Sequence, residues 1–217
     1  MVTALVWLGV LLGLFGLGRV WIVQAYEFLA VNAPIEADVL VVEGWLPDYA
    51  LEEVAVEWRQ GTYQKIITLG EPLRHGYFLS QYKSYATLAA ATLSTLGVDS
   101  DRIVAIPFPL VERDRTKTSA LYLQAWLQEH DPSICAINLY SLGPHARRSW
   151  FLFRQTLHPR VRVGILSGTP KEYQPQCWWN YSAGVRSMLS EMIGYIYAFI
   201  FSLLTRSKAV EGIAISL

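Results

Sequence analysis

The sequence has few charged residues and no excess of either sign. Charged residues make up 17% of the chain, and 18 Lys and Arg balance 18 Asp and Glu. A protein that holds nucleic acid through its phosphates needs a basic surface field. This composition excludes such a field, and we expect no nucleic-acid partner.

Cysteine is also scarce, with only Cys135 and Cys177 in the chain. Neither lies in a CxxC or Cys/His spacing, so no metal site is expected from them. Both are predicted to be structural, and one disulfide between them in an oxidising compartment is the alternative. The sequence also lacks HExxH, Gly-x-Ser-x-Gly, and a GxGxxG after the first predicted strand. Those absences argue against zinc proteases, common serine hydrolases and dinucleotide-binding enzymes.

Charge is almost missing from the first part of the chain. Between Val2 and Val23 only Arg19 is charged, and a helix of this length would reach about 33 Å, enough for a bilayer core. We predict a single-pass membrane anchor and linker over residues 1–30, in preference to a cleaved signal peptide or a buried helix. Gly9 and Gly13 form a small-xxx-small pair, which is the basis for an alternative in which the helix dimerises. Arg19 alone weakly favours a cytoplasmic domain.

The rest of the chain alternates short apolar runs with amphipathic segments, which predicts a parallel sheet covered on both faces. We therefore expect a three-layer, Rossmann-like α/β domain over residues 37–205, with strand order 3-2-1-4-5, and a disordered tail over 206–217. The predicted strands are 38–43, 65–69, 102–106, 134–140 and 161–166. The predicted helices begin near Asp48, Tyr82, Thr116 or Thr118, and His145, and a long helix ends the chain.

A cluster of basic residues follows the fourth predicted strand. Ser141 leads through a Gly-Pro turn to His145, Arg147 and Arg148, where a helix should begin. Helix N-termini attract anions, and arginine side chains fit phosphate or carboxylate oxygens. We expect the cations to depress the pKa of His145 and leave a neutral imidazole. The alternative is an ordinary exposed start of a surface helix.

Ligands of open parallel sheets bind beyond the carboxyl ends of the strands, where the strand order reverses. Glu43 and Gly44 end the first predicted strand, which brings Glu43 toward His145 if the order is 3-2-1-4-5. Glu43 would orient His145, hold a cation or act as a base, and Gly44 would let a ligand approach the backbone. An Arg-paired structural carboxylate is the alternative. Gly70-Glu71-Pro72 and Ser167-Gly168-Thr169 should lie on the same rim.

The segment Glu112-Arg-Asp-Arg-Thr-Lys-Thr118 also falls on this rim. Its hydroxyls, backbone amides and Arg115 could bind anion oxygens at a helix start. A solvated loop with a threonine cap is the alternative. Near the end of the chain, a run without charge from Met192 to Leu204 is short for a membrane span. It predicts a core helix, with a helix lying on the membrane as the alternative.

Taken in order, these segments resemble the SanA/YdcF/ElyC-like family of bacterial envelope-associated proteins over residues 37–200. The resemblance rests on Ala37-Asp38, Glu112-x5-Thr118, His145-x-x-Arg148 after the fourth strand, and Glu191-x-x-Gly194-Tyr195. It implies a role in cell-envelope integrity or peptidoglycan-precursor metabolism, carried by Glu112, Thr118, His145 and Arg148. It also implies a bacterial plasma-membrane protein with an extracytoplasmic domain. One branch is associated with S-adenosylmethionine. The chain departs from the family at Val42-Glu43-Gly44-Trp45, where many members have a glycine-rich turn.

The main hypothesis is an anchored enzyme that acts on a small anionic or phosphate-bearing ligand, with a lipid-linked envelope precursor as the expected substrate class. His145, Glu43 and Glu112 are the predicted proton-transfer residues. The predicted ligand-binding residues are Arg148, Thr118, Ser141, Gly44, Arg115 and Arg147. A non-catalytic envelope sensor or assembly factor and an S-adenosylmethionine-binding protein are the alternatives. The sequence names no cofactor and no metal.

Overall fold

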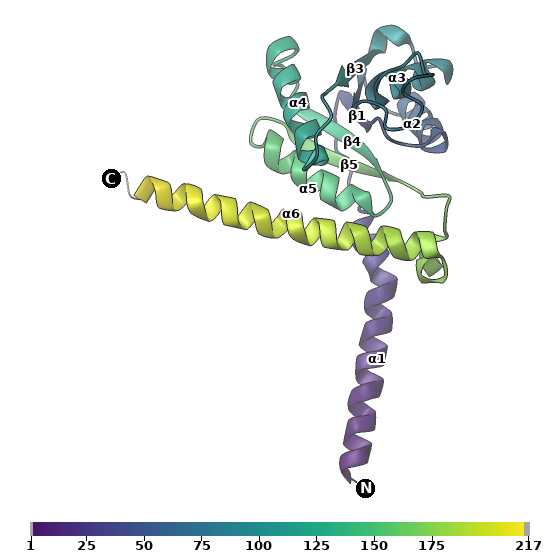
Figure 1. Cartoon of the computed structure of the whole chain (residues 1–217), viewed down its shortest axis with the longest axis vertical. Coiled ribbons are helices and arrows are strands. Elements are labelled where there is room, and N and C mark those ends of the chain that lie inside the picture. Colours follow the sequence, from purple (N-terminus) through teal and green to yellow (C-terminus); the bar gives the residue numbers. More distant parts are fainter. Residues whose placement is uncertain (1, 215–217) are drawn as a thin grey trace.

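A computed structural model describes the backbone of residues 2–214, with side chains throughout residues 21–204 and at a few earlier positions. Five parallel strands form one sheet in the order β3-β2-β1-β4-β5, as the sequence predicts. The strands are β1 (Val39–Glu43), β2 (Lys65–Gly70), β3 (Ile103–Pro107), β4 (Ala136–Leu142) and β5 (Arg162–Gly168). The helices are α1 (Val2–Leu29), α2 (Asp48–Gln60), α3 (Tyr85–Thr95), α4 (Arg115–His130), α5 (His145–Leu157) and α6 (Ser182–Ala214), with short 3-10 turns η1 (Ser100–Arg102) and η2 (Pro175–Asn180) (Figure 1).

Two apolar cores lie on the two faces of the sheet, which makes the domain a three-layer structure. Alternate side chains of β1 point to opposite faces, so Val41 joins one core and Leu40 the other. Helices α4 and α5 cover the first face, for example through Leu123 and Phe153. Helices α2 and α3 cover the second. All five residues of β1 are buried, as expected for a central parallel strand.

Two of the predicted helix caps are wrong. Asp48 is the first residue of α2 and Pro47 is the N-cap residue. Helix α4 begins at Arg115, after Asp114 in the left-handed conformation (φ 55°), so neither Thr116 nor Thr118 caps it. The tight entry into α5 is made by Gly143, whose φ of 48° favours glycine. This turn places His145 at the first position of α5.

Helix α1 extends away from the sheet domain, and its last turns pack against the domain (Figure 1). Ala25 and Leu29 are buried with Trp178 and Met188, and the Trp178 indole N–H donates to the Ile22 carbonyl at 3.1 Å. Most residues before residue 21, including Gly9 of the predicted dimer pair, are described by their backbone alone, and their burial lies outside the described part. The membrane anchor and the dimer therefore stay predictions.

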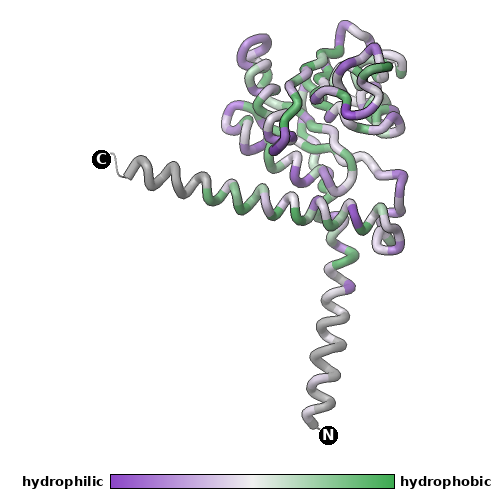
Figure 2. Tube along the Cα trace, in the orientation of Figure 1, coloured by the Kyte–Doolittle hydropathy of each residue, from purple (hydrophilic) through white to green (hydrophobic). Residues whose placement is uncertain are grey.

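Helix α6 is not the core helix that the sequence predicts. Among the residues whose side chains the structure describes, Ser182–Leu204 is the one helical stretch long and apolar enough to cross a membrane, and only 17% of its most apolar window is buried. Its apolar residues continue far along the exposed helix (Figure 2). The helix runs to Ala214, into the segment 206–217 for which we expect disorder, and residues 215–217 lie outside the described part.

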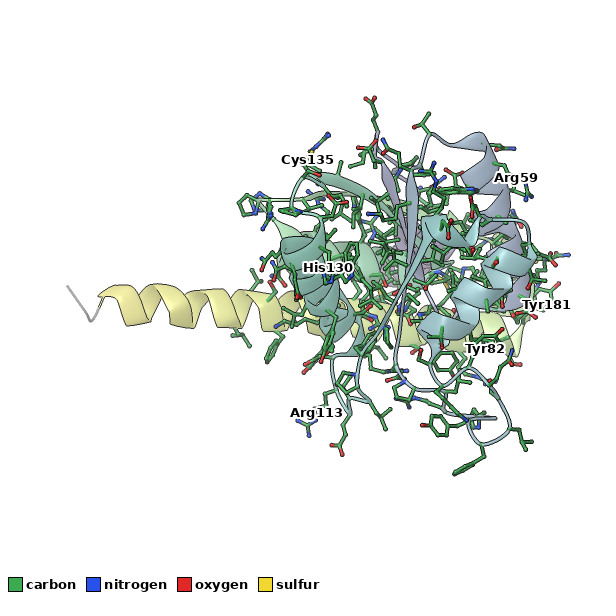
Figure 3. All side chains as sticks on the ribbon, turned by 90° about the horizontal axis from the view of Figure 1, so that it is seen from above. Arg59, Tyr82, Arg113, His130, Cys135 and Tyr181 are labelled. Atoms are coloured by element: carbon green, nitrogen blue, oxygen red, sulfur yellow. The ribbon has the colours of Figure 1, made fainter. Side chains whose placement is uncertain are left out.

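The two cysteines are not joined. Cys135 and Cys177 are both free. Cys135 is exposed, directly before β4 rather than inside the strand, and lies at the surface of the domain (Figure 3). The structure thus favours two separate thiols over the alternative of one disulfide.

Candidate functional site

A cavity of about 480 Å³ opens at the carboxyl ends of the strands, beside the point where the strand order reverses between β1 and β4. Glu43 from the end of β1 and His145 from the start of α5 line the same cavity, as the predicted strand order requires. The remaining lining residues come from the end of β2, the segments after β1, β2 and β3, the start of α4 and the residue before it, and helices α3, α5 and α6. They are Trp45, Leu69, Gly70, Glu71, Arg74, Tyr85, Phe108, Asp114, Arg115, Thr116, Ser119, Arg148 and Glu191.

Glu43 is a buried carboxylate with hydrogen bonds to both oxygens. It is only 4% exposed. Its Oε2 accepts a short hydrogen bond from the Ser141 hydroxyl, and its Oε1 accepts one from the Ser149 hydroxyl at 2.9 Å. The His145 Nε2 lies 3.5 Å from the same Oε1. Burial opposes the charge on Glu43, but His145 and the two hydroxyls outweigh it and lower the pKa of Glu43.

A second carboxylate, Glu191 of α6, holds His145 from the other side. Its Oε1 lies 3.0 Å from His145 Nδ1. Arg148 grips both Glu191 oxygens through Nε at 2.8 Å and Nη2 at 3.1 Å. Arg148 Nη1 also donates to the Thr116 hydroxyl at 3.4 Å. The imidazole is therefore fixed between two carboxylates, and a guanidinium fork fixes one of them.

The expected depression of the His145 pKa is wrong, because carboxylates rather than arginines dominate its surroundings. Burial acts against the charged imidazole, yet Glu43 and Glu191 together raise the pKa of His145 to about 9. The same contacts act on Glu191. Its burial is outweighed by His145 and Arg148, which lower the pKa of Glu191 to about 2. At neutral pH the cluster therefore contains an imidazolium between two carboxylates.

The geometry around Nδ1 accommodates His145 with or without its second proton. In the charged form the Nδ1 proton is donated to Glu191. Arg148 Nη2 lies 3.0 Å from Nδ1, so it can donate to that nitrogen once the proton has left. Trp45 stands edge-on to the ring, with 5.1 Å between ring centroids, and shields it at the cavity wall. His145 can thus exchange one proton while its ring stays in place.

Glu71, which follows β2, forms a second charged group in the cavity. Its Oε1 accepts from Arg74 Nε at 2.7 Å and from Arg115 Nη1 at 3.2 Å. Its Oε2 is buried and has no hydrogen-bond partner among the residues that the structure describes. A buried polar atom without a partner is uncommon and calls for an explanation. Because Glu71 lines the cavity, a ligand that donates a hydrogen bond would satisfy it.

Three of the predicted ligand-binding residues make contacts with other parts of the protein. Gly44 packs so closely on the chain that an added Cβ would lie 2.7 Å from the backbone of Leu69 and Tyr85, so packing alone requires glycine here, and its predicted role toward a ligand stays a prediction. Arg147 turns away from the cavity, donates to the Phe28 carbonyl and covers the Phe28 ring at 4.1 Å. Ser141 is fully buried, and its hydroxyl donates a hydrogen bond to Glu43.

The predicted segment 112–118 reaches the cavity with different residues from those the sequence favours. Glu112 is exposed and Thr118 is half-buried, and neither lines the cavity. The neighbouring Arg113 points outward from this loop (Figure 3). Thr116 and Arg115 are the members that line the cavity. The helix starts at Arg115, one turn earlier than a Thr118 cap would place it, and this turns Thr118 away.

Sequence reasoning missed several residues of the site. Glu191 entered only through the resemblance, and Glu71 only as part of a rim segment. Arg74, Thr116 and Ser149 carried no signal beyond their proximity to strand ends and helix starts. Among the residues that the structure describes, no group of three or more His, Cys, Asp or Glu is arranged to hold a metal ion.

The raised pKa of His145 makes folding stability depend on pH. A group whose pKa rises on folding, here from 6.5 to about 9, stabilises the fold fully below pH 6.5 and loses that contribution as the pH passes about 9. We expect thermal unfolding in detergent to show a loss of up to roughly 3 kcal/mol across this window. The His145→Gln variant should lack this part of the loss. Parallel pH profiles of the two proteins would contradict the assigned cluster.

No protein-family model matches the chain, and no curated protein matches it significantly.

Proposed function

We propose that the chain is a membrane-associated acid–base enzyme acting on a lipid-linked phosphate ester. The observation that carries this proposal is the buried His145, held between Glu43 and Glu191 at the wall of a cavity at the carboxyl ends of the strands. Such a cavity is where open parallel sheets bind ligands. A titratable group with a perturbed pKa in a cleft is typical of catalytic sites.

His145 suits the role of proton donor. Its pKa of about 9 keeps it protonated at neutral pH. As water adds to phosphorus and the bond to the alcohol oxygen breaks, the imidazolium gives its proton to the leaving alkoxide. Both water protons leave the water with the phosphate. The released phosphate then gives one of them to His145, which restores the imidazolium. Glu43 and Glu191 hold the ring and stabilise its charge between turnovers.

Arg74 and Arg115 suit the role of anion contacts better than Arg148. Arg148 already makes three hydrogen bonds to Glu191 and Thr116. Arg74 and Arg115 each spend one donor on Glu71, and their side chains are about half exposed beside the cavity. A guanidinium has five N–H donors, so both retain donors for phosphate oxygens. The Glu71 Oε2 would accept a hydrogen bond from a hydroxyl group of the same ligand.

A small groove supports a lipid-linked substrate over a soluble one. It measures about 100 Å³ and shares Asp114, Thr116 and Arg148 with the main cavity, so the two adjoin. Apolar side chains from α5 and α6 line it, among them Leu152 and Ala198. A phosphate in the cavity would therefore leave its hydrocarbon chain in contact with α6.

The membrane anchor is part of this proposal. The apolar run from Val2 to Val23 supports it, and α1 extends away from the domain (Figure 1). The resemblance supports the plasma membrane of a bacterium, an extracytoplasmic domain and a substrate of the cell envelope. An anchored enzyme with a site that accepts a lipid phosphate would meet its substrate in the same membrane.

The experiment compares two phosphates and two variants of α6, using the full chain reconstituted in vesicles. We expect phosphate release from dioleoyl phosphatidate to exceed that from soluble glycerol 3-phosphate. Ala198→Trp fills the groove, and should lower release from phosphatidate roughly tenfold or more while leaving the soluble ester unaffected. Ile196→Trp, on the exposed side of the same helix, is the matched control.

A binding protein without turnover is the second candidate, because His145 and the three charged groups around it are already paired with one another. It predicts that phosphatidate binds, that Ala198→Trp weakens the binding, and that no phosphate is released. Equal loss with both esters in Ala198→Trp would contradict the lipid groove. Absence of both binding and release would contradict the proposed substrate class.

A further inference from the structure

Helix α6 has one face that belongs to the domain. Glu191 pairs with Arg148, Tyr195 packs edge-on against Phe151, and Ser202 accepts a hydrogen bond from Gln155. Met188, one turn before Glu191, is buried. These positions recur every three to four residues, as expected for one side of a helix.

The opposite face of α6 is an apolar stripe that no described part of the chain covers. We call it the α6 stripe, and it consists of Leu189, Ile193, Ile196, Ile200 and Leu203. All five side chains are exposed, Ile193 to 67%. Their spacing of four and three residues alternates, so they form one continuous line along the helix. Exposed apolar surface on this scale marks a contact with a membrane or a partner.

Helix α6 cannot cross a bilayer while it stays packed as observed. Glu191 and Ser202 are 11 positions apart, about 16 Å along the helix, and both bind side chains of α5. Helix α6 therefore lies alongside the domain over this length. Moving it into a bilayer core would break the ion pair with Arg148 and strip a carboxylate from its partners.

The position of α6 relative to α1 favours a lipid surface as the occupant. Helix α6 runs across the domain end of α1, and α1 continues beyond it, away from the sheet (Figure 1). The two helices meet where Phe28 packs edge-on against Tyr195, with 5.7 Å between ring centroids. On α1, Trp21 is exposed near this junction, as is common for tryptophan at the bilayer interface. If α1 enters a bilayer, the α6 stripe lies at its surface.

Charge at the ends of the stripe fits an anionic lipid surface. Arg186 is exposed and lies one turn before Leu189. In the sequence, Arg206 and Lys208 follow Leu203. Basic residues beside an apolar helix face are typical of helices that lie in the headgroup region. Long arginine and lysine side chains in general can reach the headgroups while an adjacent apolar helix face lies among the acyl chains.

We propose that α6 is a membrane-surface helix, with the α6 stripe buried in the lipid interface and its opposite face holding Glu191 in the site. The proposal concerns how the domain sits on the membrane and holds whether or not His145 catalyses a reaction. It deepens the proposed function only by placing the groove beside α6 at the lipid surface.

Depth-dependent fluorescence quenching tests this on the full chain in phosphatidylcholine and phosphatidylglycerol vesicles. Cys135 and Cys177 are replaced by serine, and single cysteines at positions 189, 196 and 203 carry an environment-sensitive dye. Lipids with spin labels near the headgroup or deep in the acyl chain act as quenchers. We expect all three positions to be quenched to a similar extent, and more strongly by the shallow label. Val56→Cys on α2, an exposed apolar position away from α6, is the control and should not be quenched.

Each other outcome overturns the proposal. Quenching that deepens steadily from position 189 to 203 would show that α6 enters the bilayer core. Protection without quenching, together with cross-linking between cysteines at position 196, would show a second copy on the stripe. A dye that is neither quenched nor protected would show that the stripe is exposed to water. All six substituted positions, including the control at Val56, are exposed or partly exposed, so the fold should survive the changes.

Discussion

Glu43→Ala is expected to destabilise the protein by about 3–5 kcal/mol, because it leaves His145 as a buried charge without one of its two carboxylates. The change also removes the acceptor of the buried Ser141 and Ser149 hydroxyls. Thermal unfolding of the full chain in detergent at pH 6 measures the effect. Glu129→Ala, at an exposed carboxylate of α4, is the matched control and should change stability by no more than about 0.5 kcal/mol.

The double variant Glu43→Ala/His145→Leu separates the destabilisation caused by an unpaired buried charge from the destabilisation caused by lost packing. Removal of both partners should cost less than the sum of the two single changes, since no uncompensated charge is left behind. In the single Glu43 variant, NMR titration should also find the His145 pKa below its present value of about 9. Additive losses and an unchanged His145 titration would contradict the pairing.

His145→Gln is expected to lower phosphate release from the lipid ester by 10²- to 10⁴-fold, roughly the contribution of a positioned proton donor. Glutamine retains hydrogen-bonding capacity but cannot transfer the proton. Binding of phosphatidate, measured by equilibrium sedimentation with vesicles above the level set by the anchor, should change little. Arg115→Ala should show the reverse pattern, with weaker binding as its main effect.

The comparison of these two variants distinguishes catalysis from ligand binding. If His145→Gln and Arg115→Ala weaken binding alike and leave release per bound lipid unchanged, His145 holds the ligand and does not transfer a proton. Glu129→Gln is the control, because the Glu129 side chain is exposed at the C-terminal end of α4. The result does not depend on how α6 meets the membrane.

The sheet and its order were predictable because they depend on local patterns. Continuous apolar runs such as Val39–Val42 alternate with helical segments, and short connections permit few topologies. The meeting of Glu43 and His145 followed from that order alone. Both residues stand at the ends of adjacent elements, where the sheet fixes their positions.

The rest of the site depends on how elements distant in sequence pack together. Glu191 approaches His145 only because α6 crosses α5, and no periodicity in the sequence encodes that crossing. The sequence predicts a lowered pKa for His145 because it does not reveal that this carboxylate lies beside the ring. With Glu191 in place, the pKa is raised. The sequence shows Arg147 and Arg148 beside His145, but the carboxylates that reverse their effect come from β1 and α6.

Loop direction and the burial of α6 were unpredictable for related reasons. Whether Glu112 or Thr116 reaches the cavity depends on the left-handed Asp114, which changes the chain direction just before α4. The apolar run in α6 has the composition of a core helix, but burial depends on what packs against it. Here α5 covers one side and leaves the other exposed.

The connection between α1 and the sheet determines how the domain can move. Ala33 exchanges two backbone hydrogen bonds with Ile165 of β5, and Asn138 of β4 binds both the N–H and the carbonyl of Ile35. The chain is thus tied to the sheet within a few residues of the end of α1. A domain attached in this way has no flexible linker that would let it rotate relative to α1. If α1 is fixed in a bilayer, the cavity keeps a constant height and orientation, and the protein finds ligands by lateral diffusion in that plane.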